Sequence, residues 1–365
     1  MTAQQPLRLE ALTGLRGLAA WLVVFYHIRL SLTALLPAPV IAMLAKGYLA
    51  VDLFFMLSGF VLWLTYGPKL ARFEPADIGA FWWRRIARIW PLHAVVLSGF
   101  ILLAALLAIT GRDSAGYPLA ELPLHVVLIQ NWGFTGALAW NHPAWSISTE
   151  MAAYLLFPLL AVLGRRAWGP AALAIGLGLL LAGLFALFAA LGHASLGDAI
   201  TTLGLARCLI EFTAGTLAAR LWLHWRALPS ARRIGHICGA AAAATCGAGL
   251  WFALPETAWV PLALLLLLLA MALAEGRIAA WFASGPVHWL GEVSYSTYLC
   301  HFGLFIVFKL ALVGADLQLG VWKLAAFIGL LVVVSGLSHA LIELPAQRAL
   351  NALQPRRKTN AALSR

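Results

Sequence analysis

Long apolar runs follow one another along the chain from residue 12 to residue 342, and only short polar breaks separate them. A membrane-spanning helix needs about 20 mainly apolar residues to cross roughly 30 Å of hydrocarbon. A backbone in lipid must satisfy its own hydrogen bonds, and runs such as 264–269 lack the alternation of barrel strands, so the pattern predicts helices. Windows of this length predict ten spans, at 12–30, 48–66, 91–109, 146–163, 168–192, 201–222, 236–253, 258–275, 288–310 and 321–342.

The composition supports this interpretation, because 62% of the 365 residues are hydrophobic and only 11% are charged. A soluble domain carries about 25% charged residues, so this chain lacks the polar groups to cover a water-facing surface. We predict an all-α fold, a polytopic transmembrane helical bundle of about ten spans that forms one domain over residues 1–345. The basic, polar residues 346–365 are expected to form a disordered cytoplasmic tail.

The basic residues predict an orientation. With both termini in the cytoplasm and ten alternating spans, 18 of the 25 Lys and Arg residues lie in inside segments and four lie outside. Such a split follows the positive-inside rule. It also accounts for the net charge of +11 without a nucleic-acid partner. We expect a multi-pass protein of a bacterial-type cytoplasmic (inner) membrane.

Charged side chains within the spans are the candidates for chemistry, because each costs about 2.5–3.5 kcal/mol at the bilayer centre on insertion scales. Arg16 and His27 are eleven residues apart in the first span, so they share one helix face and lie about 16 Å apart along the axis. An alternative is a polar pair that only stabilises helix packing. Six ionisable residues from five spans are predicted to reach a similar depth in the outer half: His27, Asp52, Glu150, Arg207, Glu211 and His301. Imidazoles and carboxylates in one layer favour general base catalysis.

A segment with interleaved arginines and tryptophans precedes the third span, with the sequence FWWRRIARIWP at 81–91. Arg84 and Arg88 are one turn apart and suit the phosphates of a ligand, while tryptophan faces suit a purine. The alternative is an interfacial anchor of the kind that basic and aromatic residues often form. The four cysteines are isolated, and the sequence has no HExxH or Walker-type motif, so we predict no metal site.

Six short motifs, in order along residues 8–345, resemble those of the acyltransferase-3 family of membrane acyltransferases. They are RLEALTGLRGLAA at 8–20 with His27, VDLFFMLSGF at 51–60, RIARIWPL at 85–92, WSISTE at 145–150, LGEVSYSTYLCH at 290–301 and IELP at 342–345. Thr149 stands where the family often has Val or Leu. One motif alone would be weak support, whereas six in the same order make the resemblance specific.

The resemblance implies a ten-helix domain that uses acyl-CoA, often acetyl-CoA, from the cytoplasmic side. The acyl group would go to a hydroxyl of a sugar, a polysaccharide, a lipid-linked carbohydrate or another small acceptor. Arg16 and His27 would be the essential pair, and Arg85 with Arg88 the basic motif. Acyl-CoA would be a co-substrate, so no permanently bound cofactor is expected; the other partners would be the acceptor and membrane lipids.

We therefore expect a catalytic set of His27, Glu150 and Arg16, in which His27 is the general base and Glu150, in preference to Asp52, orients it. The residues expected to bind acyl-CoA or the acceptor are Arg84, Arg85, Arg88, Asp52, Arg207, His301 and Tyr298. A two-step route through an acylated His27 stays open. The alternative function is a secondary transporter or exporter of a lipid or acylated sugar, although the sequence shows no clear inverted repeat.

Overall fold

The computed structural model describes residues 9–314 and 317–354, and within these ranges it is all-helical with no β-strand. The long helices are α1 (Glu10–Ile28), α3 (Ala50–Leu70), α4 (Pro75–Ile109), α6 (Ala144–Leu163), α7 (Pro170–Ala190), α8 (Ile200–Trp225), α9 (Ala231–Trp251), α10 (Glu256–Ala272), α13 (Ser294–Leu312) and α14 (Val321–Ser338). The shorter ones are η1 (Arg29–Leu32), α2 (Ala38–Leu44), η2 (Gly47–Leu49), η3 (Leu119–Glu121), α5 (Leu122–Val126), α11 (Gly276–Phe282), α12 (Gly285–Glu292), the π-helical turn η4 (His339–Glu343) and α15 (Leu344–Ala352).

A helix occupies each of the ten predicted spans, and the helical class is confirmed. By length and composition, eight helical segments of the described chain can cross a membrane, or nine if the α10–α11 pair, bent by 101°, counts as one span. The helix α8 is not among the eight, and it carries the buried charges of Arg207 and Glu211. The cytoplasmic placement of both termini stays a prediction.

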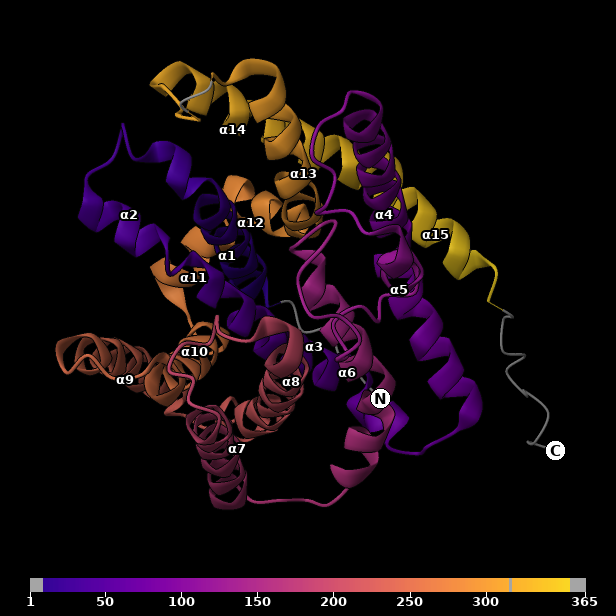
Figure 1. The fold of residues 1–365 in the computed structure, drawn as a ribbon. Helices are drawn as coiled ribbons and strands as arrows, with labels where there is room; N and C mark the ends of the chain where they lie inside the picture. The colour runs from indigo at the N-terminus through magenta and orange to yellow at the C-terminus, as the bar shows by residue number, and fades with distance from the viewer. Residues whose placement is uncertain (1–8, 315–316, 355–365) are drawn as a thin grey trace.

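Helix α3 makes its most extensive contact with α8, and the two helices lie close together in Figure 1. At this crossing a Cβ on Gly59 would lie 1.9 Å from the Phe212 carbonyl oxygen, and one on Gly215 would lie 1.9 Å from the Met56 carbonyl oxygen. Only glycine permits such a close approach, and small residues at helix interfaces are typical of membrane bundles. The remaining neighbours include α9 with α10, α13 with α14, and α4 with α15.

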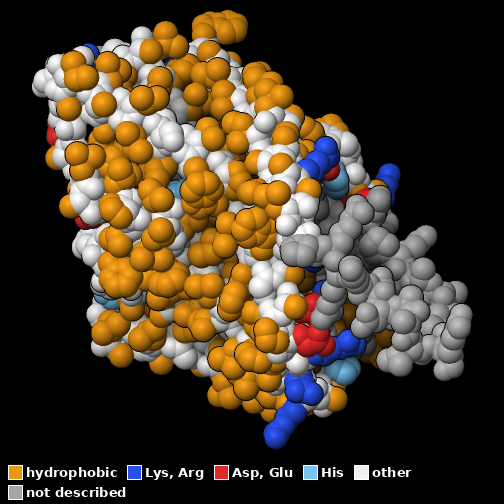
Figure 2. All heavy atoms as spheres, turned by 90° about the vertical axis from the view of Figure 1, so that its right-hand side faces the viewer, with side chains coloured by type: hydrophobic (Ala, Val, Ile, Leu, Met, Phe, Trp, Pro, Cys, Tyr) orange, Lys and Arg blue, Asp and Glu red, His pale blue; other side chains and the backbone are white. Residues whose placement is uncertain are grey.

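Hydrophobic side chains make up most of the face of the molecule that is seen in Figure 2. Lys, Arg, Asp and Glu gather at one end of this face. Helix α4 exposes Leu102 by 72%, Leu106 by 58% and Ile109 by 84%. An apolar surface of this extent has hydrocarbon rather than water as its solvent.

The tail predicted at residues 346–365 begins inside a helix, because α15 extends from Leu344 to Ala352. This helix packs beside α4, where the Trp83 indole donates to the Leu350 carbonyl at 2.8 Å. The last part of the predicted tail, 355–365, lies outside the described residues. The helical domain thus continues past the predicted boundary at residue 345.

Candidate active site

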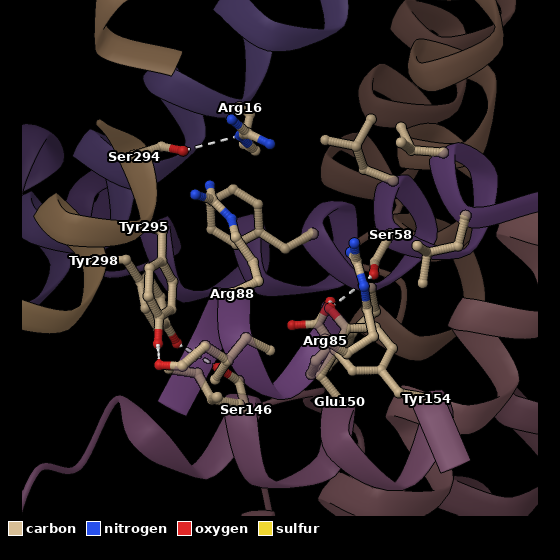
Figure 3. A pocket seen from close by; sticks show the side chains of 17 residues that line it. Arg16, Ser58, Arg85, Arg88, Ser146, Glu150, Tyr154, Ser294, Tyr295 and Tyr298 are labelled. Atoms are coloured by element: carbon tan, nitrogen blue, oxygen red, sulfur yellow. Dashed lines mark hydrogen bonds between the residues drawn. The ribbon is translucent and has the colours of Figure 1, made fainter. Parts of the chain in front are cut away.

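A polar cavity lies inside the bundle where α1, α3, α4, α6 and α13 meet, and it has a volume of about 200 Å³ (Figure 3). It is called the arginine cavity below. Its polar lining consists of Arg16, Ser58, Arg85, Arg88, Ser146, Glu150, Tyr154, Ser294, Tyr295 and Tyr298. Five of the six sequence motifs therefore contribute to one cavity, although they come from helices far apart in the chain.

Arg16 holds α1 against the junction of α12 and α13. Its Nη2 donates to the Gly291 carbonyl at 2.6 Å and its Nε donates to Ser294 Oγ at 2.9 Å. The two helices approach closely enough that a Cβ on Gly17 would lie 2.6 Å from the Gly291 nitrogen. The glycines of the first and fifth motifs thus allow the contact that positions the Arg16 guanidinium at the cavity.

Arg88 forms an ion pair with Glu343 of the closing motif. The Glu343 side chain is 0% exposed, and its other oxygen accepts a hydrogen bond from Ser296 Oγ at 2.7 Å. Glu343 ends the π-helical turn η4, and it lies 3.2 Å from His339 Nδ1. A buried carboxylate needs such partners. The closing motif therefore balances the charge of Arg88.

Arg16 and Arg85 have no carboxylate within 4.0 Å among the described residues. The Arg85 guanidinium lies over the aromatic rings of Tyr66 at 5.4 Å and Tyr154 at 5.9 Å. Glu150 lines the same cavity, where it accepts a hydrogen bond from the Tyr154 hydroxyl at 2.5 Å. The cavity therefore holds two guanidinium groups that pair with no carboxylate of the described residues, and such groups attract an anionic ligand.

His27 and His301 face one another, with His301 Nε2 3.1 Å from His27 Nδ1 and ring centroids 4.9 Å apart. His301 Nδ1 lies 2.6 Å from the Tyr298 carbonyl oxygen, and His27 Nδ1 lies 2.9 Å from the Val23 carbonyl oxygen. A carbonyl oxygen only accepts, so each Nδ1 carries a proton. His301 Nε2 is then the acceptor between the rings. The geometry leaves the lone pair of a neutral His27 on Nε2, which has no hydrogen-bond partner among the described residues.

Tyr298 stands between the arginine cavity and the histidines. It lines the cavity, and its ring centroid lies 6.0 Å from that of His301. Its hydroxyl donates to the Pro143 carbonyl at 3.1 Å and lies 2.7 Å from Ser146 Oγ at the start of α6. His27 and His301 do not line the cavity. The two parts of the expected site are thus neighbours separated by one aromatic ring.

The six ionisable residues predicted to share a depth do not form one cluster, and their common depth stays a prediction. Asp52 accepts two hydrogen bonds of 2.6 Å from Arg207, and both side chains are essentially unexposed. Glu211 is also fully buried, and neither of its carboxylate oxygens has a hydrogen-bond partner in the described chain. Asp52 and Arg207 do not line the arginine cavity, so their geometry is that of a charge pair joining α3 to α8.

Two further expectations differ from the structure. Glu150 does not orient His27, because it hydrogen-bonds Tyr154 and lies with the arginines. No described carboxylate pairs with either His27 or His301. Arg84 lines a separate cavity of about 790 Å³ with Lys69 and Trp83, on a different face of α4 from Arg85. The depth of a residue along a helix does not fix the direction in which its side chain points. That direction places Glu150 and Arg84 apart from the partners expected for them.

The sequence predicts no role for Glu343, Ser294 or Tyr154, although each has a clear one in the structure. Glu343 pairs with Arg88, Ser294 accepts from Arg16, and Tyr154 donates to Glu150. The sequence does carry a signal for Glu343, because a carboxylate at the end of an apolar span needs a cationic partner. Nothing in the sequence alone distinguishes Ser294 and Tyr154 from other polar residues on their helices.

Comparison with known proteins agrees with the geometry. The family model described as "Acyltransferase domain" matches residues 9–340. Acyltransferase MdmB of Streptomyces mycarofaciens is 30% identical, over 95% of this chain and 94% of its own length. Protein 2 in picA locus of Rhizobium radiobacter is 33% identical over 43% of this chain and 84% of its own, and O-acetyltransferase OatA of Staphylococcus aureus is 28% identical over 42% and 25%.

No solved structure matches the chain. The family model nevertheless covers nearly all of it, including Arg16, His27 and every residue that lines the arginine cavity. The relative that aligns over almost its full length is named an acyltransferase. These matches favour an enzyme over the alternative of a transporter. The chain belongs to the acyltransferase-3 family, and it is a membrane acyltransferase.

Proposed function

We propose that this enzyme transfers an acyl group, acetyl in the simplest case, from acyl-CoA to a hydroxyl of a carbohydrate or another small acceptor. The observation that carries the proposal is a pair of guanidinium groups, Arg16 and Arg85, which have no carboxylate partner among the described residues. They line a cavity inside the bundle that Tyr298 separates from His27 and His301. The phosphates of CoA supply the missing negative charge. The thioester end then extends past Tyr298 toward the histidines.

Arg88 has a different part in donor binding from Arg85, because Glu343 already neutralises most of its charge. We assign it to holding the cavity wall between α4 and η4. Arg84 lines a separate cavity in which Asp77 pairs with Lys69 at 3.2 Å, and it attracts the anionic nucleotide to this end of the bundle without contact with the reacting atoms. The positive-inside orientation predicted from the sequence places this end in the cytoplasm, where acyl-CoA is found.

In the proposed reaction, His27 Nε2 takes the proton of the acceptor hydroxyl as the oxygen attacks the thioester carbonyl. The carbon–sulfur bond breaks, and the proton held by His27 passes to the CoA sulfur, so the products are an ester and free CoA. During the reaction His27 becomes an imidazolium. Its Nδ1 proton is then held by the Val23 carbonyl and by His301 Nε2, which stabilises the charge.

The donor site is tested by binding of acetyl-CoA to the purified, membrane-reconstituted protein. Arg85→Gln removes an unpaired guanidinium and is expected to raise the Kd for acetyl-CoA at least about tenfold, because charge-assisted hydrogen bonds contribute roughly 1.5–3 kcal/mol. Arg112→Gln changes an exposed arginine in the segment after α4 and is the matched control. A Kd that stays at the wild-type value in Arg85→Gln would show that Arg85 is only a membrane anchor.

A further inference from the structure

A second, much smaller polar cavity lies where the segment between α4 and α6 meets the start of α6. It is called the amide cavity below, and its polar lining includes His125, Gln130, Asn131, Asn141, His142 and Trp145. Its volume is about 10 Å³. That is room for about one water molecule or one hydroxyl group. Most of these side chains are almost fully buried.

The amide cavity is one aromatic ring away from the proposed catalytic base. The His142 ring stacks on Phe302 with centroids 4.8 Å apart, and the Phe302 ring meets His27 edge-on at 5.4 Å. Asn141 also donates from Nδ2 to the Leu299 carbonyl at 3.0 Å, close to His301 on the same helix. The cavity therefore approaches the histidines through Phe302, whereas the arginine cavity approaches them through Tyr298.

The lining of the amide cavity has unused hydrogen-bonding groups. Gln130, Asn131 and Asn141 each use their side-chain amide nitrogen to donate to a backbone carbonyl, at 2.9–3.2 Å. The side-chain oxygen of each is buried and has no partner among the described residues. Both ring nitrogens of His125 are also buried and have no hydrogen-bond partner among the described residues. Buried polar atoms without a partner destabilise a fold, so several around one cavity indicate that a water molecule or a ligand group supplies hydrogen bonds there.

We propose that the amide cavity binds one hydroxyl of a neutral, polyhydroxylated acceptor, so that another hydroxyl, farther along the same molecule and beyond the Phe302 ring, lies at His27. This inference rests on the proposed function and names the acceptor class. Amide oxygens only accept, so the ligand must donate, and a hydroxyl both donates and accepts. The cavity has space for a hydroxyl but not for a sugar ring, so the ring itself lies outside.

A neutral ligand fits because the lining has no charged side chain in its resting form. His125 and His142 lie between the spans, and burial lowers the pKa of both, that of His125 to about 4. Both imidazoles are therefore neutral at pH 7. Among the described residues, no carboxylate or guanidinium lines the cavity. In the absence of acceptor a water molecule has the size and the partners to occupy the same place.

The test uses the full-length protein in lipid nanodiscs with labelled acetyl-CoA. Two classes of probe are compared: neutral methyl glycosides, which carry several hydroxyls, and simple primary alcohols, which carry one. His125→Phe keeps the ring shape and removes both unpartnered nitrogens. We expect kcat/KM for the glycosides to fall about tenfold, which corresponds to roughly one lost hydrogen bond. The kcat/KM for primary alcohols and the KM for acetyl-CoA should stay unchanged.

Two variants complete the experiment. His142→Phe preserves the stacking on Phe302 and is expected to act like His125→Phe, so the proposal remains testable if one variant fails to fold. Tyr117→Phe removes an oxygen in the same segment from a residue outside the lining, and it should change nothing. The melting temperature of His125→Phe should equal or exceed that of the wild type, because an apolar ring replaces unpaired polar atoms.

Unchanged glycoside kinetics in both histidine variants would overturn the inference and identify the amide cavity as a site for structural water only. A wild-type enzyme that prefers primary alcohols or amines to glycosides would also overturn it. Failure of the proposed function looks different. In that case the wild type transfers no acetyl group to any probe, or His27→Gln transfers it at the wild-type rate.

Discussion

Replacement of His27 by Gln tests the centre of the proposed mechanism. A glutamine side chain retains an amide that can donate to the Val23 carbonyl, which accepts from His27 Nδ1 at 2.9 Å in the structure. It keeps much of the bulk but cannot take up a proton. General base catalysis contributes about 10²–10⁴ in rate, which corresponds to roughly 3–5.5 kcal/mol in the activation free energy. We expect a loss of turnover in this range.

The assay measures acetyl transfer from labelled acetyl-CoA to a methyl glycoside, with turnover divided by the amount of protein in the same membrane sample. The KM for acetyl-CoA should change little, because His27 does not line the arginine cavity. The general base assignment is refuted if His27→Gln keeps more than about a tenth of the wild-type turnover. Disappearance of the protein from the membrane would instead indicate that His27 serves helix packing.

His301→Gln provides the matched comparison for the same assay. His301 Nε2 accepts a hydrogen bond from His27 Nδ1. This bond keeps the proton of a neutral His27 on Nδ1 and its lone pair on Nε2. A glutamine oxygen can accept the same hydrogen bond, so most of this positioning is retained. We expect a loss of about tenfold or less, in the range of one neutral hydrogen bond. A larger loss than that of His27→Gln would assign the base to His301 instead.

Two more predictions follow from the packing of the site, and one follows from the distribution of basic residues along the chain. Glu343→Gln leaves the Arg88 guanidinium without its partner and should destabilise the solubilised protein by about 3–5 kcal/mol. The loss is measured as a lower melting temperature, and adding Arg88→Gln to the same chain should partly restore it. Gly291→Ala should reduce activity and abundance, because its Cβ would lie 2.0 Å from a backbone oxygen of α1, whereas Gly285→Ala in the same helix meets nothing within 4 Å and should be silent. A topology reporter at the C-terminus should be cytoplasmic and one at Gly116 external; the reverse result for Gly116 would invalidate the charge-based orientation.

The helices are predictable because the length of an apolar run decides whether a segment can cross hydrocarbon. Each predicted span contains a helix, including the crowded stretch 236–275, which forms α9 and α10. The span predicted at 288–310 divides at Val293 into α12 and α13. Hydropathy does not report such a break. It arises where Gly291 meets α1 and Arg16 donates to the Gly291 carbonyl at the end of α12.

For two residues on one helix, the sequence also predicts correctly that their side chains point to the same side. The spacing of Arg16 and His27 places them on one face, and both contact the α12–α13 chain, at Gly291 and at His301. Eleven residues are three helical turns, so this relation depends only on helix geometry. The relative placement of residues on the same helix therefore follows from their spacing in the sequence alone.

Pairing between helices is not predictable from depth. Depth alone makes Asp52 a candidate partner for His27, yet Asp52 pairs with Arg207 of α8 because the close glycine contacts of α3 and α8 bring these two side chains together. One residue changes the direction of a side chain by about 100° around a helix. Span boundaries inferred from sequence are uncertain by about two to four residues, so depth does not identify the facing partner. Tertiary packing supplies that information.

The spacing within the SYSTYLCH motif has a physical explanation in this arrangement. Tyr298, His301 and Phe302 are three and four residues apart on α13, so they occupy one face of the helix. Tyr298 forms the wall of the arginine cavity, and His301 contacts His27. Phe302 connects His27 to His142 at the amide cavity. A little more than one helical turn thus contacts the proposed donor site, the base and the proposed acceptor site. A shift of one residue along this part of α13 would rotate all three side chains away from these contacts together. Three residues on separate loops would not be coupled in this way.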